Sequence, residues 1–411
     1  MAERDVGVLI VGGGLAGASC AAALREEGYD GSVLVVGREP DPPYERPPAS
    51  KDYLRGEIER HHALVHPPQW WEENSVELLT RTSVMKLDPS ERVAQLSTKD
   101  SVRYEKALLA CGANVRRLRV DGGGLEGLHY LRTLGNSDSI RAEAEQAEKV
   151  VLVGGSYIAC EVAASLTASG RDCTMVMPEA LPLSLGFGET AGRFFAEQLR
   201  SHGVELVTGD GLARFEGDER VARVVTESGR SVDADLVVLG TGAVPDVMLA
   251  RSAGLELGES GGVRCSDRLE TSAPGLWAAG DLCEYESVLH GRRMRIEHFE
   301  VAAAQGAAAA RAMLGKAGAF DEVPYFWSDL ADWCSLEYVG PASDWDREVV
   351  RGSPDDGRFT IFYLADGRLA AALTVGRPED LEAARRWLAA GTDLGRQESA
   401  LADPGSDLGG L

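Results

Sequence analysis

A glycine-rich turn near the N-terminus, placed between an apolar strand and a helix pattern, restricts the possible folds of this chain most. Residues 6–11 form a continuous apolar run, as in a buried parallel strand, and residues 12–17 read Gly-Gly-Gly-Leu-Ala-Gly. An alanine-rich helix pattern extends to residue 27, Gly28 favours a helix end, and residues 32–36 form the next apolar run. This order predicts a strand–helix–strand unit of the kind that binds dinucleotides.

A second copy of this unit begins at Lys149. Its strand, glycine-rich turn, helix and second strand are expected at residues 150–153, 154–159, 160–169 and 173–177. An internal repeat of this kind predicts an α/β chain with two Rossmann-like nucleotide-binding domains. At roughly 150 residues per domain, a chain of 411 residues also has room for a third domain.

The C-terminal part of the chain has a different character. Apolar runs at 359–364 and 369–375 flank an Asp-Gly turn and predict a β-hairpin, and residues 378–390 form a helix pattern. A small α+β domain is therefore expected here. The last stretch, residues 396–411, is polar and glycine-rich, and we expect it to be disordered.

Charge and cysteine content narrow the class of protein. The net charge of −23 disfavours nucleic acid as a partner, and it equally disfavours an anionic membrane surface. No apolar run is long enough to cross a membrane. The seven cysteines are scattered and form no C-x-x-C pair, which is typical of reduced thiols and not of a disulfide framework or a metal site. We expect a cytoplasmic protein.

The residues of the first turn have separate roles in holding a dinucleotide. Gly12 permits the tight turn, Gly14 lets the backbone approach a pyrophosphate, and Gly17 lets the helix pack on the strand. Glu39, just beyond the second strand, can accept hydrogen bonds from the adenosine ribose. The turn residues Leu15 and Ala16 are expected at the same site.

Later segments indicate which dinucleotide binds first. An apolar strand pattern at 234–239 leads into a third glycine cluster, and a strand-like segment at 275–281 ends in Gly280-Asp281. The carboxylate of Asp281 can reach the ribityl hydroxyls of a flavin, although it could equally cap a helix. The order of the two sites also suggests FAD at the first. The nearly all-alanine helix pattern at 301–314 predicts a closely packed helix.

One loop and several later segments resemble a known family. Residues 43–51, Pro-Tyr-Glu-Arg-Pro-Pro-Ala-Ser-Lys, are similar to the PYxRPPLSK loop of NADH-dependent ferredoxin and rubredoxin reductases, whose neighbouring branch is the apoptosis-inducing-factor flavoproteins. Segments that agree, in the same order along the chain, are Ala-Cys-Gly-Ala at 110–113, Gly-Ser-Tyr-Ile-Ala-Cys-Glu at 155–161, Trp-Ala-Ala-Gly-Asp at 277–281, Arg-Ile-Glu-His-Phe at 295–299 and Tyr-Phe-Trp-Ser-Asp at 325–329. The resemblance extends over residues 5–390.

The resemblance implies a domain arrangement like that of glutathione reductase, but without its redox disulfide. An FAD domain would be split between residues 1–114 and 241–320, with an NAD domain inserted at 115–240. The α+β domain would occupy 321–395.

The resemblance also implies that Lys51 and Glu161 meet beside the reactive nitrogen of the flavin. A buried lysine needs a counter-charge, and a cation at that point stabilises the anionic reduced ring. The alternatives are a solvated loop lysine and an acid on a helix surface. Glu161 follows the second turn in an otherwise apolar helix, which makes a surface position the weaker alternative.

Other cofactor contacts are implied in the same way. Arg46 would contact FAD and Trp327 would line the flavin ring, although a loop arginine and a core tryptophan are the simpler alternatives. A single histidine is more often structural than catalytic, so no acid–base role is assigned to His298. The further residues expected at the cofactors are Ala110, Gly112, Gly242, Gly280, Glu297, His298 and Phe299.

The second turn departs from the family pattern GGGFIG. It reads Gly154-Gly155-Ser156-Tyr157-Ile158-Ala159, and the side chain of Ser156 is expected to crowd the approach to a pyrophosphate. Met177 stands where an acid normally ends the second strand, but Glu179 could still reach a ribose and would favour NADH over NADPH. The alternative is a domain that binds nicotinamide weakly. Cys111, in place of a usual threonine, is interpreted as an inert buried thiol.

Three functions follow from these residues. The leading one is a reductase that takes hydride from NADH onto FAD and passes single electrons to a ferredoxin or rubredoxin serving an oxygenase, as a monomer or homodimer. A disulfide reductase or NADH peroxidase is set aside because residues 40–60 contain no cysteine. The third is an apoptosis-inducing-factor-like protein that acts through a charge-transfer complex and partner binding. An acidic ferredoxin requires a basic face, and the candidates for it are Arg116, Arg117, Arg119, Arg292, Arg293 and Arg295.

Overall fold

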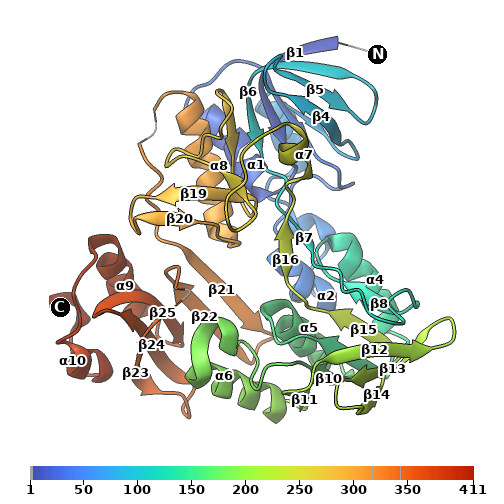
Figure 1. Cartoon of the computed structure of the whole chain (residues 1–411), viewed down its shortest axis with the longest axis vertical. Helices are drawn as coiled ribbons and strands as arrows, with labels where there is room; N and C mark the ends of the chain where they lie inside the picture. The colour runs from blue at the N-terminus through green and yellow to red at the C-terminus, as the bar shows by residue number, and fades with distance from the viewer. Residues whose placement is uncertain (1–2, 317, 343) are drawn as a thin grey trace. The chain divides into compact units, whose positions relative to one another are not determined.

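The computed structural model describes residues 3–316, 318–342 and 344–411, which form two compact units (Figure 1). The first unit comprises Met1–Glu45, His61–Asn114 and Val244–Tyr325, and the second comprises Arg46–Arg60, Val115–Ala243 and Phe326–Leu411. The nucleotide repeat is thus divided between the units, with one copy in each. Residues 46–60 belong to the second unit. The family resemblance instead implies that they are part of the split FAD domain.

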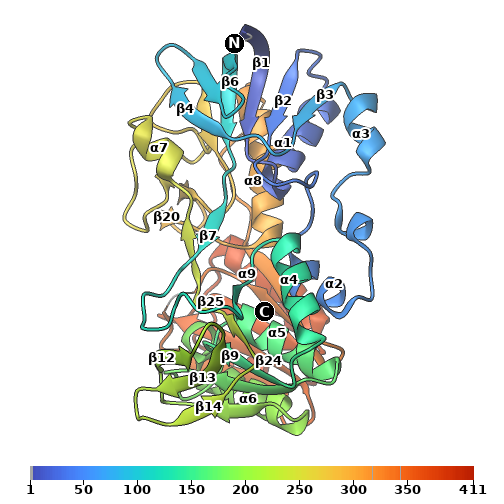
Figure 2. The ribbon, with the colours of Figure 1, turned by 90° about the vertical axis from the view of Figure 1, so that its right-hand side faces the viewer.

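A largely parallel sheet forms the first unit, in the order β3-β2-β1-β6-β5-β4 with β18 also paired to β6 (Figure 2). Its strands are β1 (Glu3–Val11), β2 (Val33–Val36), β3 (Val76–Leu79), β4 (Val84–Asp88), β5 (Val93–Leu96), β6 (Ser101–Leu109) and β18 (Leu276–Ala278). In the register, Val11 pairs with both Val36 and Leu109, so the carboxyl ends of β1, β2 and β6 meet at one edge. The strands predicted at 6–11 and 32–36 are confirmed.

Two helices of small residues, α1 (Leu15–Glu26) and α8 (Phe299–Met313), pack against each other in this unit (Figure 1). A Cβ atom at Gly306 would lie 2.1 Å from the carbonyl oxygen of Ala16, so only glycine permits this approach. The close packing predicted for 301–314 is confirmed. The shorter elements that lie in this unit or at its boundaries are η2 (Arg60–Ala63), α3 (Pro68–Glu73), β7 (Ala113–Val115), β16 (Ala243–Pro245), α7 (Met248–Ser252), β17 (Val263–Arg264), β19 (Cys283–Ser287) and β20 (Arg292–Met294).

The second unit contains the second nucleotide fold, a parallel sheet in the order β11-β10-β9-β15-β8. Its strands are β8 (Leu128–Tyr130), β9 (Lys149–Val153), β10 (Asp172–Val176), β11 (Glu205–Val207) and β15 (Leu236–Leu239). Its helices are η1 (Pro47–Ser50), α2 (Asp52–Arg55), α4 (Leu134–Ala144), α5 (Tyr157–Ala168) and α6 (Ser184–Ser201). A small antiparallel sheet of β12 (Leu212–Gly217), β13 (Val221–Thr226) and β14 (Ser231–Asp233) follows α6 and β11. The predicted repeat is confirmed.

The C-terminal part of this unit is a five-stranded sheet in the order β21-β22-β25-β24-β23. Its strands are β21 (Tyr325–Leu330), β22 (Cys334–Val339), β23 (Arg347–Ser353), β24 (Arg358–Ala365) and β25 (Arg368–Val375), and α9 (Pro378–Ala390) contacts β25. The predicted Asp-Gly hairpin is the antiparallel pair β24–β25. Among the described residues, no helix is both long enough and apolar enough to cross a bilayer.

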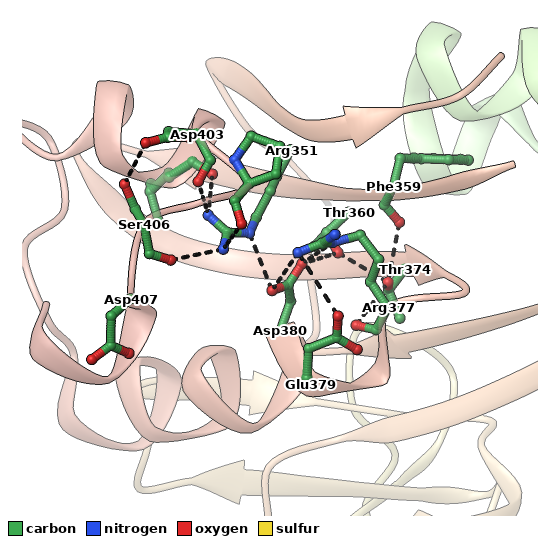
Figure 3. A network of polar contacts seen from close by, with 12 residues as sticks. Arg351, Phe359, Thr360, Thr374, Arg377, Glu379, Asp380, Asp403, Ser406 and Asp407 are labelled. Carbon is green, nitrogen blue, oxygen red and sulfur yellow. Dashed lines mark hydrogen bonds and ion pairs between the residues drawn. The ribbon is translucent and has the colours of Figure 1, made fainter. Parts of the chain in front are cut away.

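The tail expected to be disordered at 396–411 has a defined structure instead. It forms α10 (Glu398–Ala402) and η3 (Leu408–Gly410), and the side chains of Leu401 and Leu408 are buried. The buried guanidinium of Arg351 donates hydrogen bonds to tail carbonyls, including that of Ser406 at 2.8 Å (Figure 3). Two leucines and these backbone acceptors order a segment that its composition alone marked as polar.

Candidate functional site

Of the four glycines in the first turn, Gly12 and Gly17 are required for packing and Gly14 leaves space. A Cβ at Gly12, whose φ is +127°, would lie 2.1 Å from the carbonyl oxygen of Ala110, and a Cβ at Gly17 would lie 2.2 Å from the carbonyl oxygen of Gly12. A Cβ at Gly14 would meet nothing within 4 Å. Gly14 also precedes α1, so the open space lies at a helix N-terminus, where the backbone attracts a pyrophosphate. This cradle fits the diphosphate of FAD.

The acid predicted for the ribose lies next to this turn. The backbone of Gly37 packs against Gly13, since a Cβ at Gly13 would be 3.1 Å from the Cα of Gly37, and Glu39 follows two residues later. The hydroxyl of Tyr44 donates a hydrogen bond to the Glu39 carboxylate. Glu39 is thus held at the carboxyl edge of the sheet, as a ribose-binding acid requires.

The Gly280-Asp281 turn is brought to the start of α1. Gly280 has a φ of +82°, and its Cβ would lie 3.4 Å from that of Ala16. The amide of Gly280 donates to Gln305 at 2.8 Å, while the carbonyl of Asp281 accepts from Arg295 at 2.9 Å. The turn that sequence reasoning assigned to a flavin therefore lies beside the predicted pyrophosphate cradle.

The neighbouring segment of the same unit supplies His298. Burial lowers the pKa of His298 to about 4, with a smaller opposing effect from Asp281, so the imidazole is neutral at pH 7. Glu297 is paired with Arg295 at 2.5 Å, and Phe299 begins α8.

The end of β6 completes this group. The amide of Ala110 donates to the carbonyl of Val11 at 2.7 Å, which holds the strand end against the turn, and Gly112 has a φ of +69°. Burial raises the pKa of the Cys111 thiol to about 12, so it stays protonated and inert at neutral pH.

In the second unit, Lys51 and Glu161 form a buried ion pair. Lys51 Nζ lies 2.7 Å from Glu161 Oε1, and the two residues are 7% and 5% exposed. The Lys51 ammonium also lies 5.3 Å from the ring centroid of Trp327. The loop, α5 and β21 thus bring together the three residues that the family resemblance selected. The guanidinium of Arg46, in the same loop, donates to the carbonyl of Arg132 at 2.6 Å.

Two serines in this pair's surroundings were not predicted. The hydroxyls of Ser50 and Ser328 each donate to the Glu161 carboxylate at 2.5 Å. The sequence does give one indication that they lie near the site: each serine is adjacent to a residue predicted there, Ser50 to Lys51 and Ser328 to Trp327. Nothing in the local pattern indicates that their hydroxyls point to one carboxylate 110 or more residues away.

The second glycine turn carries Ser156 at the position of Gly14 in the first turn, and the structure shows how this side chain fits. A Cβ at Gly154, whose φ is +114°, would lie 2.4 Å from the carbonyl oxygen of Gly240. The hydroxyl of Ser156 donates to that same carbonyl at 2.8 Å. The expected crowding is therefore reduced, since the side chain is tied to the end of β15 instead of projecting freely in front of α5.

Glu179 lies next to the second turn, although Met177 occupies the position directly after β10 where an acid was expected. Its carboxylate oxygen Oε2 would lie 3.2 Å from a Cβ at Gly155. That oxygen is buried and has no hydrogen-bond partner among the described residues. An orphaned carboxylate oxygen beneath a dinucleotide turn fits the acid that accepts hydrogen bonds from an adenosine ribose.

The remaining residues predicted at the second site surround this turn. The ring of Tyr157 makes edge contacts with Phe187 and Phe326, at centroid distances of 5.5 and 5.3 Å, and burial raises its pKa far above the usual range. Ile158 follows it in α5, and Gly242 has a φ of +88° with nothing within 4 Å of a Cβ.

The arginines proposed as a basic face are partly neutralised within their own unit. Arg293 lies 3.5 Å from Glu286, and Arg295 is paired with Glu297. The guanidinium of Arg117 lies 5.2 Å from the ring centroid of Tyr130. A basic docking face stays a prediction. The seven cysteines are unpaired, and no cluster of metal-ligating side chains is found in the described part of the chain.

Comparisons with known proteins identify the family of this chain. Residues 6–306 match the model of the family described as pyridine nucleotide-disulphide oxidoreductase, and residues 325–411 match a reductase C-terminal domain. A ferredoxin–NAD(P)+ reductase of a Sphingomonas species is 34% identical over 98% of this chain and 96% of its own length. The putidaredoxin reductase of Pseudomonas putida is 32% identical over 92% of this chain and 90% of its own.

Solved structures give the same result. The ferredoxin reductase for the CYP199A2 system from Rhodopseudomonas palustris has a TM-score of 0.94 at 30% identity, covering 98% of both chains. The covalent putidaredoxin reductase–putidaredoxin complex contains a chain with a TM-score of 0.93 at 31% identity, covering 98% of this chain and 97% of that one. Proteins of this kind are oxidoreductases that use FAD and NAD(P)H. The chain belongs to the pyridine nucleotide-disulphide oxidoreductase family, and within it to the ferredoxin reductases.

Proposed function

We propose that this protein takes hydride from NADH onto FAD and passes the electrons singly to a small iron–sulfur protein of the ferredoxin type, which serves an oxygenase. The observation that carries the proposal is the presence of two dinucleotide turns in one chain together with a buried lysine, Lys51, that is paired with Glu161. The named relatives include reductases of dioxygenase systems, and they favour this function over the apoptosis-inducing-factor-like alternative. We infer that the protein works in the cytoplasm, where its unpaired cysteines stay reduced.

The residues of this chain have distinct tasks in that reaction. FAD, when bound, supplies the chemistry: it accepts a hydride and releases electrons one at a time. Gly12, Gly14 and Gly17 admit its diphosphate at the start of α1, and Glu39 holds the adenosine ribose. Lys51 supplies a fixed positive charge for the reduced flavin, which Glu161 keeps in place.

Anaerobic mixing with NADH in a stopped-flow instrument tests this function. The flavin absorbance should bleach within seconds, and cytochrome c should then be reduced rapidly only when a ferredoxin is added. Absence of bleaching with both NADH and NADPH would overturn the proposal. A slow reduction to an oxygen-stable product, accompanied by dimerisation, would instead support the apoptosis-inducing-factor-like alternative.

Glu179 should select NADH over NADPH. Its carboxylate lies beneath Gly155 and would repel a 2′-phosphate, and the sequence contains no lysine or arginine between Asp172 and Gly192 to compensate. We expect Glu179→Gln to lower the affinity for NADH about tenfold, the loss of one charge-assisted hydrogen bond, and to narrow the preference over NADPH.

Titration of flavin reduction with each nucleotide measures both affinities. Glu189→Gln is the matched control, because Glu189 lies nearby in α6 but is exposed and paired with Arg193. The prediction is wrong if the ratio of NADH to NADPH affinity is the same in both variants and the wild type.

A further inference from the structure

The carboxylate of Glu161 is contacted by three donor side chains, through two hydrogen bonds and one ion pair. Ser328 Oγ donates a hydrogen bond to Oε1 and Ser50 Oγ donates one to Oε2, each at 2.5 Å, and Lys51 Nζ forms an ion pair with Oε1 at 2.7 Å. Ser50 Oγ also lies 3.2 Å from the carbonyl of Pro47, but its single proton has the shorter contact with Glu161. Both oxygens of one buried carboxylate are therefore occupied by donors.

The two serines are fixed from different parts of the second unit. Ser50 ends η1, and its carbonyl accepts a hydrogen bond from Ser165 at 2.7 Å, which in turn accepts one from Arg55 at 3.3 Å. Ser328 lies in β21 and is 3% exposed. Neither hydroxyl is a mobile surface group, so the hydrogen bonds hold the carboxylate in one orientation.

This arrangement bears on the charge of Lys51. A buried ammonium and carboxylate can become a neutral amine and acid by moving one proton between them, which removes the cost of burying two charges. Hydrogen bonds donated to the carboxylate oppose that transfer because they stabilise its ionised form. A cation that must act on a flavin needs this support, since the neutral amine would carry no charge.

We propose that Ser50 and Ser328 are positioning residues that keep the Lys51–Glu161 pair ionised and thereby preserve the positive charge that the reduced flavin requires. The inference rests on the proposed function of Lys51. It extends the site from a pair of charges to a four-residue unit, in which the two hydroxyls act on the cofactor only through Glu161.

Other titratable groups near Glu161 do not keep the Lys51–Glu161 pair ionised. Tyr157 and Cys160, both in α5, interact electrostatically with Glu161. Burial raises the pKa of each well above its usual range, so both stay neutral through the pH range of an assay. Lys51, Ser50 and Ser328 are the groups that contact the carboxylate directly.

The test is the reductive half-reaction of the holoenzyme with Ser50→Ala, Ser328→Ala and the double substitution. We expect each single variant to slow hydride transfer from NADH about tenfold at pH 7, in line with the loss of a hydrogen bond to a charged group. The midpoint potential of the bound flavin should fall. The pH dependence of the rate should also differ from that of the wild type, because weaker support for the carboxylate disfavours its ionised form.

Ser137→Ala is the matched control. Ser137 lies in α4 of the same unit, is fully buried, and its hydroxyl has no hydrogen-bond partner among the described residues. We expect this variant to keep the wild-type rate, potential and pH profile. Equal FAD content and melting temperature should be established for every variant first. If an alanine variant does not fold, Ser50→Cys and Ser328→Cys fill the same space with a weaker donor and should show smaller shifts in the same direction.

A Lys51→Met variant separates the failure of this inference from failure of the proposed function. If Lys51→Met changes neither the potential nor the rate, the proposed function of Lys51 is wrong, and the inference with it. If Lys51→Met slows the reaction but the serine variants behave like Ser137→Ala at every pH, only the inference is overturned.

Discussion

A Gly14→Ala variant is expected to fold normally but to lose most of its affinity for FAD. The backbone of Gly14 has a φ of −100° and a ψ of −173°, which alanine adopts without strain, and a Cβ there meets nothing within 4 Å. The methyl group would instead occupy the space in front of α1 where the diphosphate must approach the backbone. Losing one or two charge-assisted hydrogen bonds corresponds to a decrease in affinity of about 100-fold.

The measurement compares the free energy of unfolding of the apoprotein with the affinity for FAD, determined by calorimetric titration of the apoprotein. Gly14→Ala should change the unfolding free energy by less than about 1 kcal/mol, the scale of a helix N-cap substitution. Gly17→Ala is the contrasting variant: its Cβ would lie 2.2 Å from the carbonyl oxygen of Gly12, so the apoprotein itself should be destabilised. If Gly14→Ala binds FAD within threefold of the wild type, this turn is not the diphosphate site.

The parts of this molecule that could be predicted are those determined by local pattern. An apolar run, a glycine turn and a small-residue helix follow one another in the sequence, so the strand–turn–helix units at Gly12 and Gly154 could be identified without contacts. The alanine-rich pattern at 301–314 likewise indicated close packing, and Gly306 shows the reason. Pairing of Lys51 with Glu161 came from the family resemblance, since no spacing rule connects a loop with a helix so far along the chain.

The parts that could not be predicted depend on where side chains point after the chain has folded. Ser156 is expected from the sequence to crowd the approach to a pyrophosphate, whereas in the structure its hydroxyl donates to the backbone carbonyl of Gly240, at the end of a strand distant in sequence. Glu179 was two residues beyond the expected position, and only the path of the chain after β10 brings it back to Gly155. Ser50 and Ser328 converge on Glu161 through tertiary packing alone.

In the C-terminal tail, the sequence pattern also fails to predict whether the segment is ordered. Its average composition is polar and rich in glycine, which favours disorder. Average composition cannot show that Leu401 and Leu408 are each buried. It also cannot show that the guanidinium of an arginine distant in sequence donates hydrogen bonds to the tail backbone. Two buried leucines and one buried charged residue, Arg351, therefore order a segment whose composition alone favours disorder.

An Asp380→Leu variant is expected to destabilise the C-terminal part of the second unit by about 3–5 kcal/mol, the cost of removing one partner of a buried ion pair. Asp380 is 2% exposed and lies 3.2 Å from Arg351, which is 3% exposed, and 2.7 Å from Arg377 (Figure 3). The hydroxyl of Thr360 also donates to it at 2.7 Å. Without this carboxylate the guanidinium of Arg351 stays buried with carbonyls as its acceptors and loses the carboxylate with which it forms its ion pair.

The tail should loosen first, because Arg351 connects it to β23 and α9. The same guanidinium donates to Pro404 at 3.2 Å and to Ser406 at 2.8 Å, and rearrangement of the unpaired charge towards water would break these bonds. Limited proteolysis should therefore cut Asp380→Leu after residue 396 at enzyme levels that leave the wild type intact. Calorimetry should show a lower melting temperature.

A double variant, Arg351→Met with Asp380→Leu, distinguishes an unpaired charge from lost packing. If the cost arises from the uncompensated guanidinium, removing it should restore at least half of the lost unfolding free energy, as replacement of buried pairs by apolar residues often does. The tail should nevertheless stay sensitive to protease, because methionine donates nothing to its carbonyls. A double variant as unstable as Asp380→Leu alone would show that the shape of these side chains, and not their charge, stabilises this part of the protein.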